Sequence, residues 1–172
     1  MVTTILFGLY SAGVAIAVTL IGYFTGIDKT STGSWFGWLS VPFLILFIWM
    51  AMNERKREDY NGNMSYGQCI GTGTLVGLFA GIAVAIFMYV YLTNINPGFV
   101  DFTIQKTQAS MQSNPNMSAD QIQKATSMTR QWFVPMGVLF ALIGDVFFAL
   151  IISLIVGAFV KTKEGESGVK AV

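Results

Sequence analysis

One carboxylate, Asp145, is the residue whose chemistry most needs an explanation. It lies in an apolar stretch, Phe133 to Val160, that contains no other charged residue. In a helix, Asp145 would be about 18 Å beyond Phe133, which is near the middle of a lipid bilayer. An ionised carboxylate there costs roughly 2.5–3.5 kcal/mol on insertion scales. Burial therefore favours the neutral acid, which both donates and accepts hydrogen bonds.

Three roles for Asp145 follow from its position. It can bind a proton or cation in a transporter, or it can hydrogen-bond between helices and subunits, facing Thr72, Thr74 or the small residues of other apolar stretches. It can also extend its carboxyl group toward the membrane surface. A transport pathway usually contains several polar groups, and this chain has few in its apolar stretches, so the sequence favours the structural contact.

The other residue types exclude several kinds of chemistry. The chain has no histidine and one cysteine, Cys69, so a Ser–His–Asp or Cys–His catalytic arrangement cannot form. Its carboxylates are scattered, and we expect no metal site and no cofactor. The net charge of +1, without a basic arm, gives no indication of nucleic-acid binding. We therefore predict that the protein is not an enzyme and has no catalytic residues.

The composition indicates a membrane protein. Hydrophobic residues make up 53% and charged residues 11% of the 172 residues, against about 25% charged in an ordinary soluble domain. The apolar runs are continuous rather than alternating, which indicates helices. We predict an all-α, integral membrane four-helix bundle that forms a single domain over 1–172. Its predicted spans are 4–27, 35–52, 68–92 and 133–160.

Basic residues predict the orientation of these spans. They are densest between the second and third spans and after the fourth span, at Arg55, Lys56, Arg57, Lys161 and Lys163. The positive-inside rule then places both termini in the cytoplasm. An alternative role for the Arg-Lys-Arg cluster is binding of lipid or a partner, but neighbouring acidic residues neutralise it, so we interpret it as a topology determinant.

The segment 93–131 is too long for a simple connection. Asn96 followed by Pro97 predicts a helix start, and "NPN" at 114–116 interrupts that helix. Ser118 with Gln121 predicts a capping box that opens a second helix. We expect Ile122, Ala125 and Met128 on one side of it. The sequence thus predicts a helical hairpin on the non-cytoplasmic side, either extending the spans or lying along the bilayer surface.

Glycines in the third span predict a helix-packing face. Gly73, Gly77 and Gly81 recur every four residues and so lie on one side of the helix. Small residues at this spacing let two helix backbones approach closely in lipid. This face can pack inside the chain's own bundle, or it can bind a second copy or another membrane subunit.

Several of these features together resemble a known family. They are "SYGQCIGTG" at 65–73, "YVYLTNINPGFVDF" at 89–102, the capped helix with its methionine, and the lysine-rich tail. The chain resembles, over nearly its whole length, the bacterial four-span membrane family catalogued as domain of unknown function 4199. The resemblance implies a bacterial inner membrane setting and no established site residues. It also implies a partner, because the family is found beside membrane-associated glycosyltransferases.

We therefore expect a multi-pass protein of the bacterial inner membrane, with cytoplasmic termini. Its expected function is that of a non-enzymatic accessory or scaffold protein. It would act through helix–helix association, as a homo-oligomer or with another membrane protein such as a membrane glycosyltransferase. The alternative is a small oligomeric proton- or cation-coupled transporter or channel that uses Asp145.

Overall fold

The chain folds into helices joined by short turns. The structure, a computed structural model, describes residues 1–30, 33–113 and 117–162. Within these ranges every regular element is a helix, and four helices are long and apolar enough to cross a membrane. The predicted all-α, four-span fold class is therefore confirmed, including a helical hairpin between the third and fourth spans.

The first span is α1 (Val2–Thr25), which ends at Gly26. Gly26 has φ 71°, in the left-handed region that glycine adopts without a steric penalty. The chain then turns through a short 3-10 helix, η1 (Ile27–Lys29), which carries Asp28. The turn places this carboxylate directly beneath the end of the first span.

The second span consists of α2 (Gly33–Phe36), the 3-10 helix η2 (Gly37–Ser40) and α3 (Val41–Glu58). Pro42 lies in the first turn of α3, where its missing N–H leaves no helical bond unmade. The helix α3 continues past the predicted span end at Met52 as far as Glu58. The three basic residues at 55–57 therefore lie in the last helical turn, where positive charge interacts favourably with the helix dipole.

The third span begins with a capping box. The hydroxyl oxygen of Ser65 accepts the N–H of Gln68 at 3.3 Å, and the Gln68 side chain accepts the N–H of Ser65 at 2.8 Å. α4 (Tyr66–Val90) continues into one π-helical segment, η3 (Tyr91–Ile95). The backbone N–H of Asn96 closes this segment on the carbonyl of Tyr91 at 2.7 Å. Such wide turns are frequent at functional sites.

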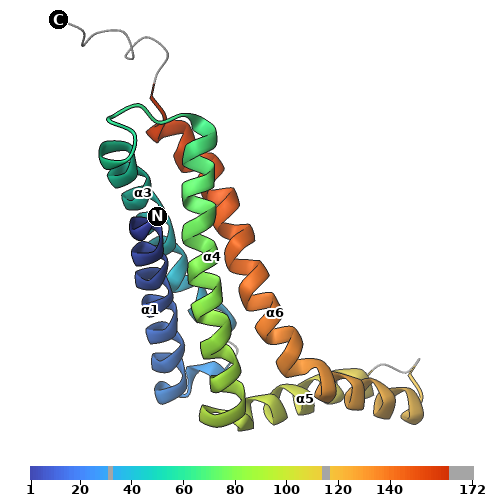
Figure 1. Cartoon of the computed structure of the whole chain (residues 1–172). Coiled ribbons are helices and arrows are strands. Elements are labelled where there is room, and N and C mark those ends of the chain that lie inside the picture. The colour runs from blue at the N-terminus through green and yellow to red at the C-terminus, as the bar shows by residue number, and fades with distance from the viewer. Residues whose placement is uncertain (31–32, 114–116, 163–172) are drawn as a thin grey trace, which may run out of the picture.

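The hairpin is built from α5 (Pro97–Gln112) and the first part of α6 (Ala119–Val160). Pro97 lies in the first turn of α5, and Ser118 and Gln121 form the predicted capping box of α6. α6 is one helix of 42 residues, so the hairpin extends the fourth span, which is one of the two predicted arrangements. Pro135 lies inside α6 and removes a helical hydrogen bond, which favours the bend that α6 shows between bundle and hairpin (Figure 1).

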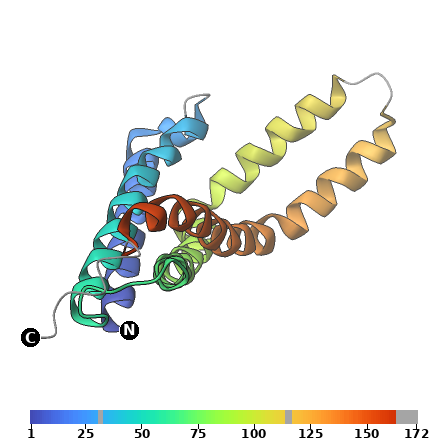
Figure 2. The ribbon, with the colours of Figure 1, turned by 90° about the horizontal axis from the view of Figure 1, so that it is seen from above.

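α4 occupies the centre of the bundle and packs against α1, α3 and α6 (Figure 1). α1 begins and α6 ends at the end where α3 leads into α4, which we call the basic end. The hairpin extends sideways from the opposite end, the hairpin end (Figure 2).

Inside the hairpin, Ile104 and Ile122 are buried, and Arg130 forms an ion pair with Asp101 at 2.7 Å. Met128, expected on the same side as Ile122, is instead 62% exposed.

The interior and exterior of the bundle are both apolar, as a bilayer requires. Large hydrophobic side chains face outward, among them Phe24 and Phe159 at 79% and 85% exposed. An apolar surface of this extent marks an interaction site or a membrane-facing surface. The buried apolar cluster between the helices consists of Phe7, Leu44, Ile48, Ala51, Met52, Met64, Cys69, Val76, Ala149, Ile152 and Val160.

Candidate functional site

Asp145 lies on α6 where this helix crosses α4. Its Cβ would lie 3.2 Å from a Cβ added at Gly81, so the side chain starts inside the bundle. The Oδ2 atom is buried and has no hydrogen-bond partner among the residues that the structure describes. Asp145 borders a cavity of about 50 Å³, which is large enough for a water molecule. The other residues around this cavity are Ser11, Ala12, Ala15, Ser40, Val41, Leu44, Ala80, Val84 and Phe148.

The two threonines that the sequence placed opposite Asp145 have other surroundings. Thr72 is fully buried at the basic end, where its hydroxyl donates to the carbonyl of Gln68 at 2.8 Å and accepts from Arg55. The Thr74 hydroxyl oxygen is buried, with no hydrogen-bond partner in the described part of the chain. Neither threonine borders the Asp145 cavity. The residues with polar side chains that border it beside Asp145 are Ser11 and Ser40.

The glycine face of α4 packs against the chain's own α6. A Cβ added at Gly73 would meet the hydroxyl of Ser153, and one at Gly77 would meet the methyl group of Ala149. A Cβ at Gly81 would lie 3.0 Å from the carbonyl oxygen of Leu142. These glycines therefore allow the close approach of α4 and α6 inside one chain, and they are not available on the surface.

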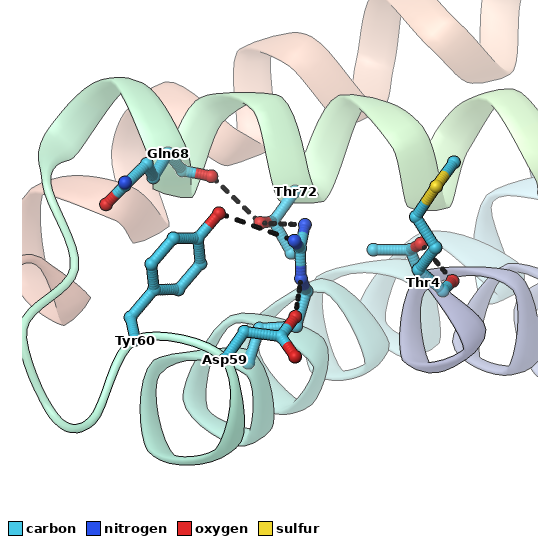
Figure 3. Close-up of polar contacts among 7 residues, drawn as sticks. Thr4, Asp59, Tyr60, Gln68 and Thr72 are labelled. Carbon is cyan, nitrogen blue, oxygen red and sulfur yellow. Dashed lines mark hydrogen bonds and ion pairs between the residues drawn. The ribbon is translucent and has the colours of Figure 1, made fainter.

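Arg55 organises a polar cluster at the basic end (Figure 3). Its guanidinium donates to Asp59 at 2.7 Å, to the buried hydroxyl of Thr72 at 3.0 Å and to the hydroxyl of Tyr60 at 3.3 Å. The Arg55 side chain is only 14% exposed. The hydrogen bond from Arg55 holds the pKa of the Asp59 carboxyl below its usual value. The cluster ties the end of α3 to the start of α4.

The other predicted topology determinants also lie at this end. Lys56 donates to the carbonyl of Val160 at 2.8 Å, which satisfies an acceptor at the end of α6. Lys161 lies over the ring of Tyr66, with 5.7 Å from its ammonium nitrogen to the ring centroid. Arg57 is exposed. The predicted residue Lys163 lies outside the described residues.

A second acidic group, which the sequence interpretation did not consider, lies at the hairpin end. Asp28 Oδ2 accepts from the side-chain amide of Asn96 at 2.8 Å and from the hydroxyl of Tyr91 at 3.4 Å. Asn96 also donates to the Tyr91 hydroxyl oxygen at 2.9 Å. Asp28 and Tyr91 border a cavity of about 240 Å³. The sequence interpretation used Asn96 only as the residue before Pro97 at a helix start.

Metal-ligating residues do not gather in this structure. Within residues 1–30, 33–113 and 117–162, no group of three or more His, Cys, Asp or Glu residues is close enough to hold an ion. Cys69 is buried and unpaired within the described chain. The described residues thus present two separate carboxylates, one at each of two cavities.

Four membrane-length helices around an apolar core define a multi-pass, all-α membrane protein. Its sequence belongs to the family described as protein of unknown function DUF4199, whose family model matches residues 6–162. No curated protein and no solved structure matches the chain significantly.

Proposed function

We propose that the protein is a non-enzymatic accessory or scaffold protein that associates through the outward side of α4 with itself or with another membrane protein. The observation that carries this proposal is the open space at Gly67 and Gly71. A Cβ added at either glycine meets no atom within 4 Å, whereas one added at Gly77 meets α6. α4 therefore has a second small-residue face, distinct from the one that α6 covers.

This outward face has exposed residues toward both ends of α4. Exposed residues occur at Gly67, Gly71, Ile82, Ile86 and Tyr89. Their spacings of four, eleven, four and three residues keep them on one side of a helix with 3.6 residues per turn. Because α1, α3 and α6 occupy the other sides of α4, this is the side on which a further helix can pack.

Two glycines one turn apart suit such a contact. In lipid, helices associate mainly through close packing and hydrogen bonds, since lipid tails are as apolar as the side chains. Gly67 and Gly71 let a neighbouring backbone approach at the basic end, while the larger residues farther along α4 provide contact area. The buried Thr74 hydroxyl, unpaired among the described residues, adds a polar group to the same helix.

We further propose that the protein resides in the bacterial inner membrane with its basic end in the cytoplasm. The concentration of Arg55, Lys56, Arg57 and Lys161 at that end supports this orientation under the positive-inside rule. A second copy of the chain is the first partner to test. A membrane glycosyltransferase is the second, and it is supported by the family resemblance.

Native mass spectrometry from a mild detergent tests the association. We expect Gly71→Leu to dissociate the oligomer or to release the co-purifying membrane protein. Leucine favours a helix by roughly 1 kcal/mol over glycine in peptide hosts, so this loss would not come from weaker helix formation.

Gly144→Leu is the matched control, because a Cβ at Gly144 on α6 also meets nothing within 4 Å. A Gly71→Leu variant with unchanged assembly would contradict the proposed face. A wild-type protein that is monomeric and has no partner would contradict the scaffold function.

A second candidate function rests on the Asp145 cavity. The buried Oδ2 atom has no partner among the described residues, and Ser11 and Ser40 border the same cavity of about 50 Å³. A carboxylate and two hydroxyl-bearing residues in a small space are suited to a water, a proton or a small cation. This arrangement supports a proton- or cation-coupled transporter.

Measurement of a proton-dependent flux into liposomes distinguishes the transporter function from the scaffold function. A transporter requires that Asp145→Asn abolish a proton-dependent flux, because the amide cannot carry the proton. The control is Asp101→Asn, which removes an exposed carboxylate from the hairpin. Under the scaffold function, Asp145→Asn keeps both fold and assembly, since the amide still donates and accepts hydrogen bonds.

A further inference from the structure

We propose that the cavity at the hairpin end binds a protonated primary amine carried on an apolar chain, with Asp28 as the ionic partner of the ammonium group. This site is separate from the α4 face and from Asp145. Its position at the end of the first span is where the polar head of an amphiphile would lie beside the bilayer core.

The cavity has about 240 Å³ of space and lies where α1, η1, the start of the second span, α4, η3 and α5 meet. α1 provides Thr19, η1 provides Asp28, and the start of the second span provides Phe36. Tyr91 comes from the π-helical segment η3 and Phe99 from α5. The wall is thus largely aromatic and aliphatic, with the carboxylate as its one acidic residue.

The two oxygens of Asp28 have different surroundings. Oδ2 accepts hydrogen bonds from Asn96 and Tyr91, which fix the orientation of the carboxylate. Oδ1 is buried and has no hydrogen-bond partner among the described residues. Neither of the ion pairs found in the described part of the chain involves Asp28. An enclosed carboxylate oxygen without a hydrogen bond is costly, so Asp28, a partly buried residue beside the cavity, is suited to a cationic donor.

The π-helical segment explains how these groups come together. Tyr91 and Asn96 are five residues apart, and the backbone hydrogen bond between them is the one that closes the wide turn. The turn brings the Tyr91 hydroxyl and the Asn96 amide to the same carboxylate oxygen. Both of these donors are used on Oδ2, so neither of them pairs with Oδ1.

The chemistry of the wall selects the class of ligand. Aromatic rings attract ammonium groups, including quaternary ones, and Phe36, Tyr91 and Phe99 line the cavity. The unpaired Oδ1 adds a requirement for an N–H donor, which a quaternary ammonium lacks. The remaining apolar lining favours an alkyl substituent. A protonated primary amine on a hydrocarbon chain meets all three conditions.

Such an amine has two sources, the headgroup of an aminophospholipid or a free alkylamine. To test the shared chemistry, the full chain is titrated in detergent with n-hexylamine, n-hexanol and hexyltrimethylammonium, and binding is followed by calorimetry. We expect n-hexylamine to bind tightest. Asp28→Asn should weaken its binding roughly tenfold or more and remove the preference over n-hexanol.

Two further variants serve as controls for the Asp28→Asn result. Asp101→Asn removes a carboxylate from the same end of the molecule, and it should leave n-hexylamine binding unchanged. Val18→Phe fills the cavity from α1 while retaining Asp28, and it should also abolish binding. The Val18 variant decides the question if Asp28→Asn does not fold. Equal binding of n-hexylamine and n-hexanol by the wild type, or unchanged n-hexylamine binding in both cavity variants, overturns the proposal.

Native mass spectrometry with defined lipids separates the two sources. Preferential retention of phosphatidylethanolamine over phosphatidylcholine, lost in Asp28→Asn, assigns the site to a lipid headgroup. Selective n-hexylamine binding without a lipid preference assigns it to a free amine. Because the α4 face is not involved, the oligomeric state of Asp28→Asn should equal that of the wild type. The two proposals therefore fail independently.

Discussion

Gly77 of α4 lies directly against Ala149 of α6, so that a Cβ added to the glycine would meet the alanine methyl group. The same added atom would lie 2.9 Å from the carbonyl oxygen of Asp145. Backbone atoms cannot move aside as flexible side-chain ends do, and the contact therefore sets the distance between the third and fourth spans. Gly77 and Gly71 thus have different surroundings, although both belong to α4. A Cβ at Gly77 would meet α6, whereas one at Gly71 would enter open space.

This difference predicts opposite effects of the same substitution. Gly77→Ala should lower the free energy of unfolding by about 1–3 kcal/mol, because the methyl group overpacks the α4–α6 contact. Gly71→Ala should leave stability equal or slightly higher, since its Cβ enters open space and alanine favours a helix. Unfolding in a denaturing-detergent titration measures both values. Equal destabilisation of the two variants would contradict the packing described here.

The sequence predicted the features that depend on neighbouring residues. The four apolar runs, the Ser118–Gln121 capping box and the Pro97 helix start all follow from local patterns, and the structure contains them. The continuity of α6 agrees with one of the two arrangements predicted for the hairpin, the one in which it extends the spans, although Pro135 inside a helix usually ends or kinks it.

Contacts between distant residues account for what the sequence interpretation missed. Asp28 and Asn96 are 68 positions apart, and nothing in their local sequence indicates that they hydrogen-bond. Thr72 was expected near Asp145, but the position of α3 brings Arg55 to it instead. Spacing along one helix predicts which residues share a face, and it does not predict which neighbouring helix covers that face.

The bond between Arg55 and Thr72 predicts a loss of stability when the hydroxyl is removed. Thr72→Val keeps the shape of the buried side chain but leaves the guanidinium one acceptor short, at a cost of about 1–3 kcal/mol. Arg55→Lys should cost a similar amount, because an ammonium group cannot reproduce the fork of donors. Thermal unfolding of the purified protein measures both changes.

Arg57→Lys provides the control for these variants, since Arg57 is exposed in the same helical turn. It should change stability by less than about 0.5 kcal/mol. In the double variant of Arg55→Lys with Thr72→Val, the two losses should not add, because both remove one interaction. Full additivity would show that the two side chains do not interact.

The ion pair of Arg55 with Asp59 predicts a dependence of stability on pH. The hydrogen bond from Arg55 lowers the pKa of Asp59 in the folded protein below the ordinary value of about 3.9. The stabilisation is therefore complete above that ordinary value, and it is lost as pH falls through the lower, folded-state pKa. Thermal unfolding is measured from about pH 6 down to about pH 3, a range that includes the ordinary pKa of an aspartate. The wild type should show this loss of stability, and Asp59→Asn should not. An identical acid response of both proteins would contradict the assignment.

The distribution of basic residues predicts which end of the bundle faces the cytoplasm, and single cysteines can test it. The wild type has one cysteine, Cys69, which is buried and serves as the blank. Ser110→Cys places an exposed thiol on the hairpin, and Asn63→Cys places one at the basic end. A membrane-impermeant maleimide applied to intact cells should label Ser110→Cys and not Asn63→Cys, whereas lysed cells should show labelling of both. The reverse pattern would place the basic end outside the cell and would contradict the positive-inside assignment.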